Sequence, residues 1–374
     1  MINSLFKIFK KEYQTLNRIE ISKNNLEYNY QYLSSLSGSL KIAPVIKSDA
    51  YGHGINKVAK ILNPLGAPFF CVDSLYEAYE LLKDGIKTPI LIMGYTAPQN
   101  FKVKKLPFSY AVFDLETIKV LNEYQEDCKV HIFIDTGMNR EGIQIEKIPE
   151  FLDQLKNFPN VKVEGLMSHL ASSDNPKDSL NKVQIKNFYK ALEIFKKYNI
   201  HPKWIHFFNS DGLLNHVPTS KVGRQNMARV GLALYGISHN TNLKPVLRFT
   251  TQIAQIKKVK SGDRVGYDGT YTIKKPTTIG ILPAGYYDGV DHRLSNKGSV
   301  LVNGIACPII GRVSMNITTV DLSNVSNPFI GQEVVVYSDN PNDPNSIKNA
   351  AKICKTIPYD ILIGLTASIK RIII

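Results

Sequence analysis

Between residues 20 and 240, eight short runs of β-branched and aromatic residues alternate with longer segments of helical periodicity. This alternation limits the possible folds more than any other feature, because it indicates parallel strands joined by crossover helices. The expected strands are 42–47, 69–73, 89–93, 109–113, 130–135, 161–167, 204–209 and 228–234. Eight such strands meet the requirement of an α/β fold with a closed (β/α)8 TIM barrel, whereas an open doubly wound sheet usually has fewer.

After Asn240 the pattern changes to period-two alternation without long helices. Asn303-Gly304 predicts a tight hairpin, because both central positions of a type I′ turn need positive φ. We therefore expect a C-terminal, mostly antiparallel β domain, interrupted by a helix near 346–355 and closed by a strand near 367–374. A length of 374 residues suits a barrel with a second domain.

The overall charge and the cysteines argue against several classes of partner. The net charge of +14 is spread over small, scattered lysine groups, so we expect a solvated surface and no nucleic-acid partner. Four distant cysteines without a CxxC pair predict neither a metal site nor a disulfide framework, and they suit the reducing cytoplasm. No long uncharged apolar run and no cleavable leader is evident, so we expect neither a membrane span nor secretion.

Polar residues at the ends of the expected barrel strands are the first candidates for a site, because barrel active sites form at the C-terminal ends of the strands. The candidates, in chain order, are Lys47, Arg140, His169, Asn209, Ser210, Arg229, Gly231 and Leu232.

Lys47 opens the segment KSDAYGHG (47–54) and has two interpretations. Its head can reach into water from a strand end, as many lysines do. Alternatively, desolvation and neighbouring cations can lower the pKa of its amine, which then attacks an aldehyde. The glycines after Tyr51 would let the backbone approach a ligand, and the phenol can donate to a phosphate. For His53, a structural role as a buried histidine that hydrogen-bonds to the backbone is also acceptable.

KSDAYGHG resembles the pyridoxal-phosphate lysine motif of the alanine racemases. Further segments resemble blocks of that family in the same order: DTGMNREG, GLMSHLASSD, HFFNSDG, NMARVGLALYG, VGYDGTYT, PAGYYDG and GRVSMN. The resemblance runs from about residue 15 to the end of the chain. It implies a PLP-binding barrel at 19–240, a β domain at 241–374, and an N-terminal segment, 1–18, that carries the first strand of the β domain.

The resemblance also implies catalytic roles for two residues. Lys47 would bind pyridoxal 5'-phosphate as a Schiff base and act as one acid/base group, and Tyr267 would be the other, on the opposite face. Inversion of a stereocentre by proton exchange needs bases on both faces, or one base that reaches both. In the family this tyrosine comes from the other subunit, so the resemblance implies a homodimer whose active sites are shared between chains.

The remaining roles concern the cofactor and the substrate. Arg229 would face the pyridine nitrogen and leave it unprotonated, because an arginine only donates hydrogen bonds. That makes the ring a weaker electron sink. The other residues implied are His169, which links Arg229 to the tyrosine; Arg140, near the substrate carboxylate; Tyr51, Ser210 and the amides of Gly231 and Leu232, around the phosphate; Asn209, which orients the turn; and Tyr286 and Met315, at the substrate entrance. Taken alone, Arg140 also fits a surface ion pair with Glu141.

Three positions depart from the family pattern. Phe133 stands where many members have a carbamylated lysine that supports the arginine, Asn316 replaces an aspartate at the entrance, and Ala367 falls near the position of a phosphate-binding tyrosine. None of them removes the Lys47 and Tyr267 pair.

The function implied is interconversion of L- and D-alanine, an amino-acid substrate, which in bacteria supplies D-alanine for peptidoglycan. A broader amino-acid racemase or a serine racemase would use the same residues. A PLP-barrel decarboxylase and a non-catalytic PLP-binding protein are further alternatives, although a complete β domain with Tyr267 argues against the latter.

Overall fold

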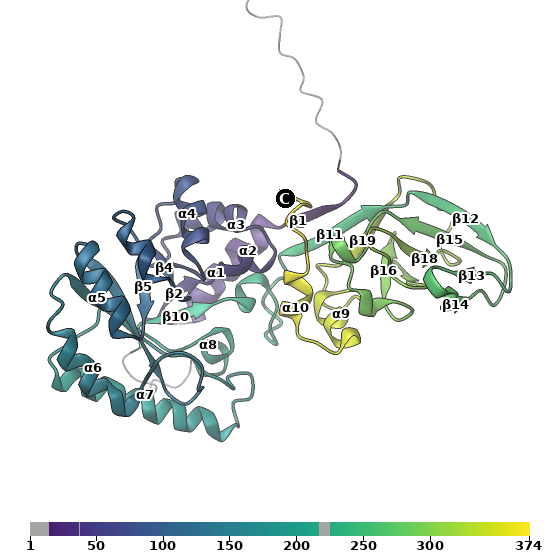
Figure 1. Ribbon diagram of the computed structural model, residues 1–374. Helices are drawn as coiled ribbons and strands as arrows, with labels where there is room; N and C mark the ends of the chain where they lie inside the picture. The colour runs from purple at the N-terminus through teal and green to yellow at the C-terminus, as the bar shows by residue number, and fades with distance from the viewer. Residues whose placement is uncertain (1–14, 37, 217–224) are drawn as a thin grey trace, which may run out of the picture. The chain divides into compact units, whose positions relative to one another are not determined.

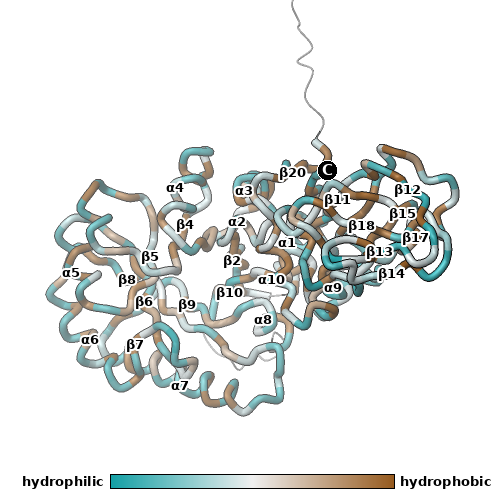
Figure 2. Tube along the Cα trace, turned by 45° about the vertical axis from the view of Figure 1, so that its right-hand side comes forward, coloured by the Kyte–Doolittle hydropathy of each residue, from teal (hydrophilic) through white to brown (hydrophobic). Residues whose placement is uncertain are grey.

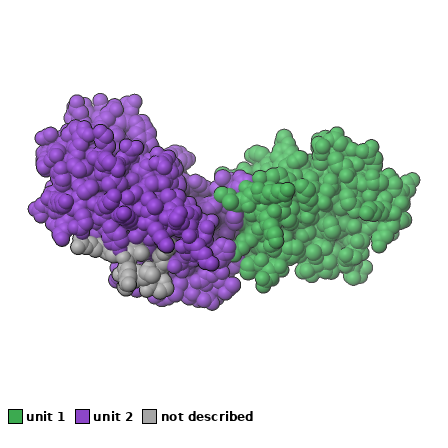
Figure 3. Space-filling view, turned by 90° about the horizontal axis from the view of Figure 1, so that it is seen from below, with its two compact units in different colours: residues 1–20, 248–357, 364–372 green, residues 21–247, 358–363, 373–374 purple. Residues whose placement is uncertain are grey.

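The computed structural model describes residues 15–36, 38–216 and 225–374. The chain divides into two compact units, which Figure 3 colours separately. The barrel unit comprises the described residues of 21–247 together with 358–363 and 373–374. The β unit comprises the described residues up to Glu20 together with 248–357 and 364–372. Residues 1–14 of the expected N-terminal segment lie outside the described residues.

The barrel unit is built on a sheet of eight parallel strands, which confirms the predicted fold class (Figure 1). In sheet order they are β2 (Lys41–Pro44), β10 (Met227–Val230), β9 (Trp204–His206), β8 (Val161–Met167), β6 (Cys128–Asp135), β5 (Ser109–Val112), β4 (Ile90–Ile92) and β3 (Phe70–Val72). A single parallel bridge between Val45 and Cys71 joins the two edge strands, so the barrel is nearly closed.

Each of the eight expected strands is present, but three end at least three residues earlier than the apolar runs suggest. β2 ends at Pro44, three residues before Lys47, and β9 ends at His206. β10 ends at Val230, after which the chain turns at Gly231 into the 3-10 helix η4 (Leu232–Tyr235). The residues left over belong to the turns at the C-terminal ends of the strands, where a barrel builds its site.

Amphipathic helices cover the barrel. They are α1 (Lys23–Leu36), α3 (Ile55–Leu62), α4 (Leu75–Lys83), α5 (Leu115–Tyr124), α6 (Ile148–Leu155), α7 (Ser179–Lys197) and α8 (Ser210–His216). Ser74, Asp114 and Asp178 cap α4, α5 and α7 through side-chain oxygens that accept backbone N–H bonds. Hydrophilic residues mark the outer turns of α6 and α7 in Figure 2, whereas their apolar residues are buried against the strands.

The β unit is mostly antiparallel, as predicted. Its largest sheet has the order β17 (Ile305–Pro308), β16 (Ser299–Val302), β19 (Glu333–Tyr337), β11 (Leu247–Gln252), β1 (Arg18–Ile21) and β20 (Lys370–Ile373). Smaller sheets pair β12 (Gln255–Val259), β15 (Thr277–Leu282) and β18 (Thr318–Asp321), and β13 (Arg264–Val265) with β14 (Tyr271–Thr272). Asn303 and Gly304 form the β16–β17 hairpin with φ of 50° and 75°.

Three further segments complete the fold. The expected interrupting helix is α9 (Ile347–Cys354), and the last strand is β20. The first strand, β1, lies between β11 and β20. An additional short helix, α10 (Pro358–Ile363), was not expected from the sequence, and its residues belong to the barrel unit.

Two observations bear on the expected absence of a membrane span and of disulfides. Within the described ranges, no helix is both long and apolar enough to cross a membrane. The four cysteines are buried, and no disulfide joins any of them in the part of the chain that the structure describes.

Candidate active site

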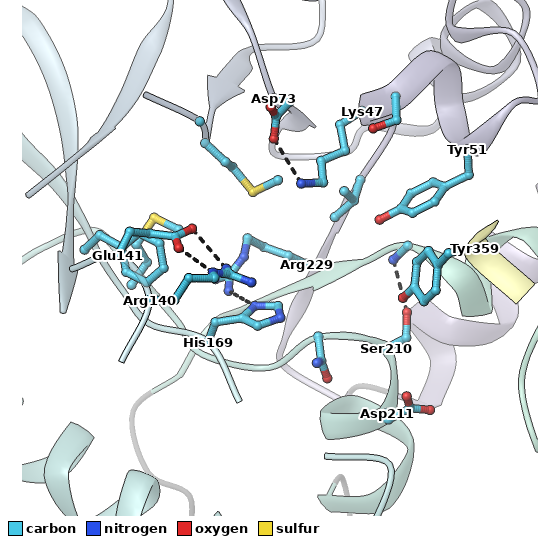
Figure 4. Close-up of a pocket in the computed structure, with 18 of the residues that line it drawn as sticks. Lys47, Tyr51, Asp73, Arg140, Glu141, His169, Ser210, Asp211, Arg229 and Tyr359 are labelled. Atoms are coloured by element: carbon cyan, nitrogen blue, oxygen red, sulfur yellow. Dashed lines mark hydrogen bonds and ion pairs between the residues drawn. The ribbon is translucent and has the colours of Figure 1, made fainter. Parts of the chain in front are cut away.

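A cavity of about 360 Å³ opens in the barrel unit where the strands end, and most of the predicted site residues line it (Figure 4). Those residues are Lys47, Tyr51, Arg140, His169, Asn209, Ser210, Arg229 and Gly231. Leu232 begins η4 next to Gly231 but lies outside the cavity lining. Eight residues that are far apart in the sequence are thus brought together in one place.

The turn after Lys47 has an unusual backbone. Ser48, Asp49, Ala50 and Tyr51 all have φ between 52° and 54°, so the short helix α2 (Lys47–Tyr51) contains a left-handed turn. Left-handed helical geometry costs L-residues roughly 1–2 kcal/mol each. Strain of this kind persists only where surrounding contacts enforce it, and it concentrates at functional sites.

The rest of the KSDAYGHG segment supplies those contacts. The ring Nδ1 of His53 lies 2.9 Å from the Ala50 carbonyl and 3.0 Å from that of Tyr51. The Asp49 carboxylate accepts the Ile55 N–H at 2.8 Å. His53 is fully buried, so its role here is to hold the turn that places Lys47 and Tyr51 in the cavity.

Lys47 has an acidic partner that the sequence interpretation missed. Its Nζ lies 3.0 Å from Asp73 Oδ1. Glu77 in turn accepts the Asp73 N–H at 2.8 Å and the Ser48 N–H at 2.5 Å. Asp73 directly follows β3, so the rule that selected the other strand-end residues also applies to it.

A group of hydrogen-bond donors gathers on the side of the cavity away from Arg140 and Glu141, around Tyr51, Ser210 and Tyr359 (Figure 4). Ser210 Oγ accepts the N–H of Gly231 at 3.1 Å and that of Ala233 at 3.3 Å. A Cβ at Gly231 would lie 2.7 Å from the Tyr51 hydroxyl, so only glycine leaves this space open. The donors surround a space that a small anion could occupy.

Asn209 holds the turn that leads to Ser210. Its Oδ1 accepts the Gly212 N–H at 2.9 Å and the Ser173 hydroxyl at 2.8 Å, and its carbonyl accepts the Leu213 N–H. The side chain thus satisfies a donor at the start of α8, as an orienting residue must.

Tyr359 is a second functional candidate that the sequence interpretation missed. It comes from α10, its ring centroid lies 5.3 Å from that of Tyr51, and burial raises the pKa of its phenol to about 12. The departure at Ala367 suggested that this tyrosine contact is absent, but the cavity holds a tyrosine eight positions earlier. Pro358 at a helix start is the signal that could have indicated it.

Arg229 is almost fully buried and contacts His169. Its Nη2 donates to the Ser168 carbonyl at 2.6 Å and lies 3.2 Å from His169 Nδ1. Burial lowers the pKa of Arg229 to about 10, so it stays protonated at neutral pH. Burial and the charges of Arg229, Arg140 and Lys47 lower the pKa of His169 to about 3. His169 is therefore neutral, and its Nδ1 accepts a hydrogen bond from Arg229.

Arg140 lines the cavity and makes a bidentate ion pair with Glu141. Phe133 is 5% exposed and packs against Ala111 and Met167, so it contributes an apolar wall and no charge. The ion pair that the sequence allowed is present, and it lies at the cavity. Glu141 is the negative partner of Arg140 in a chain that has Phe133 in place of a lysine.

The other three predicted residues belong to the β unit. Tyr267, Tyr286 and Met315 are 70%, 44% and 55% exposed. Their loops are joined within that unit, because Asp268 pairs with Arg312 at 2.7 Å and the Tyr286 N–H donates to the Ser314 carbonyl at 2.9 Å. Three exposed residues from distant segments thus share one connected set of loops.

Asn316 lies in the same loops. Its Nδ2 is 3.4 Å from Asp288 Oδ2, and that carboxylate oxygen also accepts the Gly285 N–H at 2.9 Å. An aspartate at 316 would place a second carboxylate beside Asp288, which asparagine avoids.

Known proteins resemble the chain in both units. The family model described as "Alanine racemase, N-terminal domain" matches residues 21–239, and the "Alanine racemase, C-terminal domain" model matches 246–373. The alanine racemase of Halothermothrix orenii is 34% identical over 94% of this chain and 95% of its own. Alanine racemase 1 of Caldanaerobacter subterraneus subsp. tengcongensis is 32% identical over 95% and 94%.

Solved structures agree. The alanine racemase of Clostridium difficile 630 has a TM-score of 0.90 at 28% identity and covers 97% of both chains. That of Bacillus anthracis, with bound L-Ala-P, has a TM-score of 0.88 at 29% identity and covers 97% of this chain and 96% of its own. The alanine racemase family is known to use pyridoxal phosphate. Both units, the cavity residues and the relatives lead to one conclusion: the chain belongs to the alanine racemase family.

Proposed function

We propose that the chain interconverts L- and D-alanine with pyridoxal 5'-phosphate bound in the barrel cavity, and that Lys47 and Tyr267 exchange the α-proton on opposite faces of the substrate. The observation that carries the proposal is the convergence of Lys47, Arg229 and the donors around Ser210 on one cavity in a chain of this family. In bacteria this reaction supplies D-alanine for peptidoglycan.

The residues present fit the cofactor. The space that a Cβ at Gly231 would fill, together with the hydroxyls of Tyr51, Ser210 and Tyr359, suits a phosphate, and Leu232 would add a backbone amide. Lys47 offers the amine that can hold the cofactor covalently. When bound, pyridoxal phosphate supplies an electron sink for the negative charge that develops at the substrate α-carbon.

With the cofactor bound, Arg229 would donate a hydrogen bond to its ring nitrogen and would keep that nitrogen unprotonated, since a guanidinium has no acceptor and stays charged. Held in this way by Arg229, the cofactor would supply a weaker electron sink, which would limit side reactions. His169 accepts from Arg229 through Nδ1, so its remaining ring nitrogen carries the proton that can be donated toward Tyr267.

Arg140 binds the substrate carboxylate, and Glu141 orients its guanidinium. The pair lies at the cavity, with side-chain exposures of 52% and 32%, so Arg140 is free to exchange part of its contact with Glu141 for a substrate. Tyr286 and Met315 restrict the entrance, and Asn316 leaves it without an additional negative charge. Steady-state kinetics with alanine and serine test the substrate. A clearly higher kcat/KM for serine would refute alanine as the preferred substrate.

Tyr267 reaches the site from a second copy of the chain. Its 70% exposure in loops that also carry Tyr286 and Met315 supports this assignment, because a catalytic residue facing solvent in one chain suits a shared site. Each chain of the homodimer would provide Lys47 to one site and Tyr267 to the other. A cytoplasmic location remains a prediction.

Mixing two inactive variants tests both the two-base assignment and the shared site. Lys47→Ala should lose the visible absorbance of the lysine-bound cofactor, and Tyr267→Phe should keep it but lose proton exchange. Unfolded and refolded together in equal amounts, they should regain about a quarter of wild-type activity, because half of the dimers are mixed and each mixed dimer has one intact site. If no activity returned although mixed dimers formed, the shared site would be refuted.

A further inference from the structure

Arg229 is the first member of a buried chain of polar side chains that crosses the barrel interior. Its Nη1 lies 2.6 Å from His206 Nδ1, and His206 Nε2 lies 2.7 Å from His131 Nδ1. His131 Nε2 lies 3.5 Å from Glu164 Oε2. Both histidines are fully buried, and the Glu164 side chain is 13% exposed. The four residues come from β10, β9, β6 and β8, which are consecutive strands of the barrel sheet.

Hydrogen-bond chemistry fixes the direction of this chain. Arg229 can only donate, so His206 Nδ1 must accept and its Nε2 must carry the proton. His131 Nδ1 then accepts from His206, which leaves the proton of His131 on Nε2, 3.5 Å from the carboxylate of Glu164. Burial and the charge of Arg229 lower the pKa of both histidines, although Glu164 acts in the opposite sense on His131. Each histidine is therefore neutral and is held in one tautomer.

Two features of the backbone make room for this row of buried polar side chains. The register of β6 and β8 shifts between Val130 and His131. Val130 pairs with Val163 and His131 pairs with Gly165, so Glu164 is the extra residue of a bulge. Bulges redirect a side chain, and here Glu164 also accepts the Ser109 hydroxyl at 2.9 Å. A Cβ at residue 165 would lie 2.2 Å from His131 Nδ1, so Gly165 reserves the space for that ring.

The hydrogen bonds of the Arg229 guanidinium determine which of its N–H groups remains available to a ligand. Nη1 donates to His206 Nδ1 and to the His206 carbonyl at 3.0 Å. Nη2 donates to the Ser168 carbonyl and to His169 Nδ1. A guanidinium has five N–H donors, and within the described residues these four contacts leave the Nε–H alone without an acceptor.

We propose that His206, His131 and Glu164 are positioning residues that hold Arg229 with its Nε–H available to the ring nitrogen of the cofactor. The inference rests on the proposed function, since that function gives the Nε–H its acceptor. Glu164 is the terminal acceptor: a carboxylate cannot donate, so it prevents the two histidines from reversing their protons and presenting an N–H to Arg229. None of the three touches the substrate or the cofactor.

The first test is the tautomeric state of the histidines in Glu164→Gln, measured by ¹⁵N NMR of histidine-labelled holoenzyme. In the wild type, His131 and His206 should both be neutral with an unprotonated Nδ1 at neutral pH. In the variant the amide can donate, so His131 should gain a population with a protonated Nδ1. Lys162→Gln is the matched control, because Lys162 lies on the same strand with a 59% exposed side chain, and it should leave both signals unchanged. A protonated Nδ1 in wild-type His131, or unchanged signals in Glu164→Gln, would overturn the proposal.

The second test asks whether Glu164 acts through Arg229. Glu164→Gln should lower kcat by about tenfold, within the interaction energies found in one hydrogen-bonded network, and should keep the cofactor bound. In an Arg229→Lys background, which lacks the fork of donors, the same change should have less than about a twofold effect. Equal losses in both backgrounds would refute a positioning role. The histidine NMR signals do not depend on turnover, so they test the row of buried side chains separately from the proposed function. A protein that shows these tautomers but binds no cofactor would refute the proposed function and would leave the hydrogen bonds between the histidines intact.

Discussion

Gly165→Ala places a methyl group inside the ring of His131. The added Cβ would lie 2.2 Å from Nδ1, 2.5 Å from Cγ and 2.7 Å from Cε1, whereas nonbonded carbons pack at about 3.5–4.0 Å. The ring has little room to retreat, because His131 is fully buried and packs edge-on against Phe69 with the centroids 5.2 Å apart. The substitution must therefore displace the imidazole and break its bond to His206.

The structure sets the size of the effect. Overpacking a core costs about 1–3 kcal/mol, and each buried polar group left without its partner costs about 1–3 kcal/mol. With the paired nitrogens of His131 and His206 both affected, we expect a loss of roughly 3–9 kcal/mol in the free energy of unfolding, a large share of a typical stability of about 5–15 kcal/mol. Cofactor binding in the cavity should weaken as well, since His206, the partner of Arg229, loses its own hydrogen bond to His131.

Urea unfolding followed by fluorescence measures this directly, because Trp204 is the chain's single tryptophan and lies on β9 in the barrel unit. Gly212→Ala, inside helix α8, is the control: its Cβ would meet three side-chain atoms, of Leu170, Phe208 and Asn209, at 3.0–3.2 Å and none closer, so it should cost much less stability than Gly165→Ala.

Removing the ring in His131→Ala should make Gly165→Ala less costly by at least about 2 kcal/mol, the coupling expected for residues in contact. A Gly165→Ala protein within about 1 kcal/mol of wild type, or additive effects in the double variant, would refute the packing argument.

Three further predictions concern the cavity. Glu141→Gln should raise the KM for alanine by up to about fivefold, because a partly exposed ion pair contributes at most about 1 kcal/mol. The control Glu150→Gln, from an exposed ion pair on α6, should leave KM unchanged. An unchanged KM in Glu141→Gln would show that Glu141 does not contribute to substrate binding. Tyr359→Phe should weaken the cofactor Kd by about three- to tenfold through one lost hydrogen bond, measured by absorbance titration beside Tyr95→Phe, which is 65% exposed. Because the pKa of His169 falls to about 3 in the folded protein, the unfolded chain takes up a proton first as the pH drops below about 6.5, and stability falls from there toward pH 3. His169→Asn should flatten that loss by about one proton in acid unfolding curves, and an unchanged slope would contradict a neutral His169.

The barrel and most of its site follow from local pattern. Apolar runs identify all eight strands, and the rule that barrel sites form where strands end selects residues from Lys47 to Gly231. The periodicity of apolar residues indicates which segments are buried and which are strands or helices, so it identifies each strand from that strand's own residues. It says less about where a strand stops, which is why the pattern predicts a strand through Lys47 although β2 ends at Pro44.

The parts that escaped prediction depend on contacts between distant segments. The left-handed turn at Ser48–Tyr51 is unfavourable for its own residues and exists because His53 and Asp49 hold it. Tyr359 reaches the cavity from a six-residue helix far along the chain, too short to be identified by its period. His131 and His206 sit within apolar strands, and nothing near them in sequence shows that they face each other.

A buried arginine between neutral histidines suits the role that we propose for Arg229. A carboxylate in direct contact would offset the cost of burying the guanidinium, but it would compete with the cofactor for the donors and reduce the local positive charge. Neutral imidazoles satisfy the donors without adding charge, and they keep the carboxylate of Glu164 two rings away from Arg229. Arg229 thus keeps its full charge toward the cavity, which opposes protonation of any nitrogen placed against its Nε–H. A barrel in which His206→Asp preserved both the cofactor spectrum and kcat would show that this separation of charge is unnecessary.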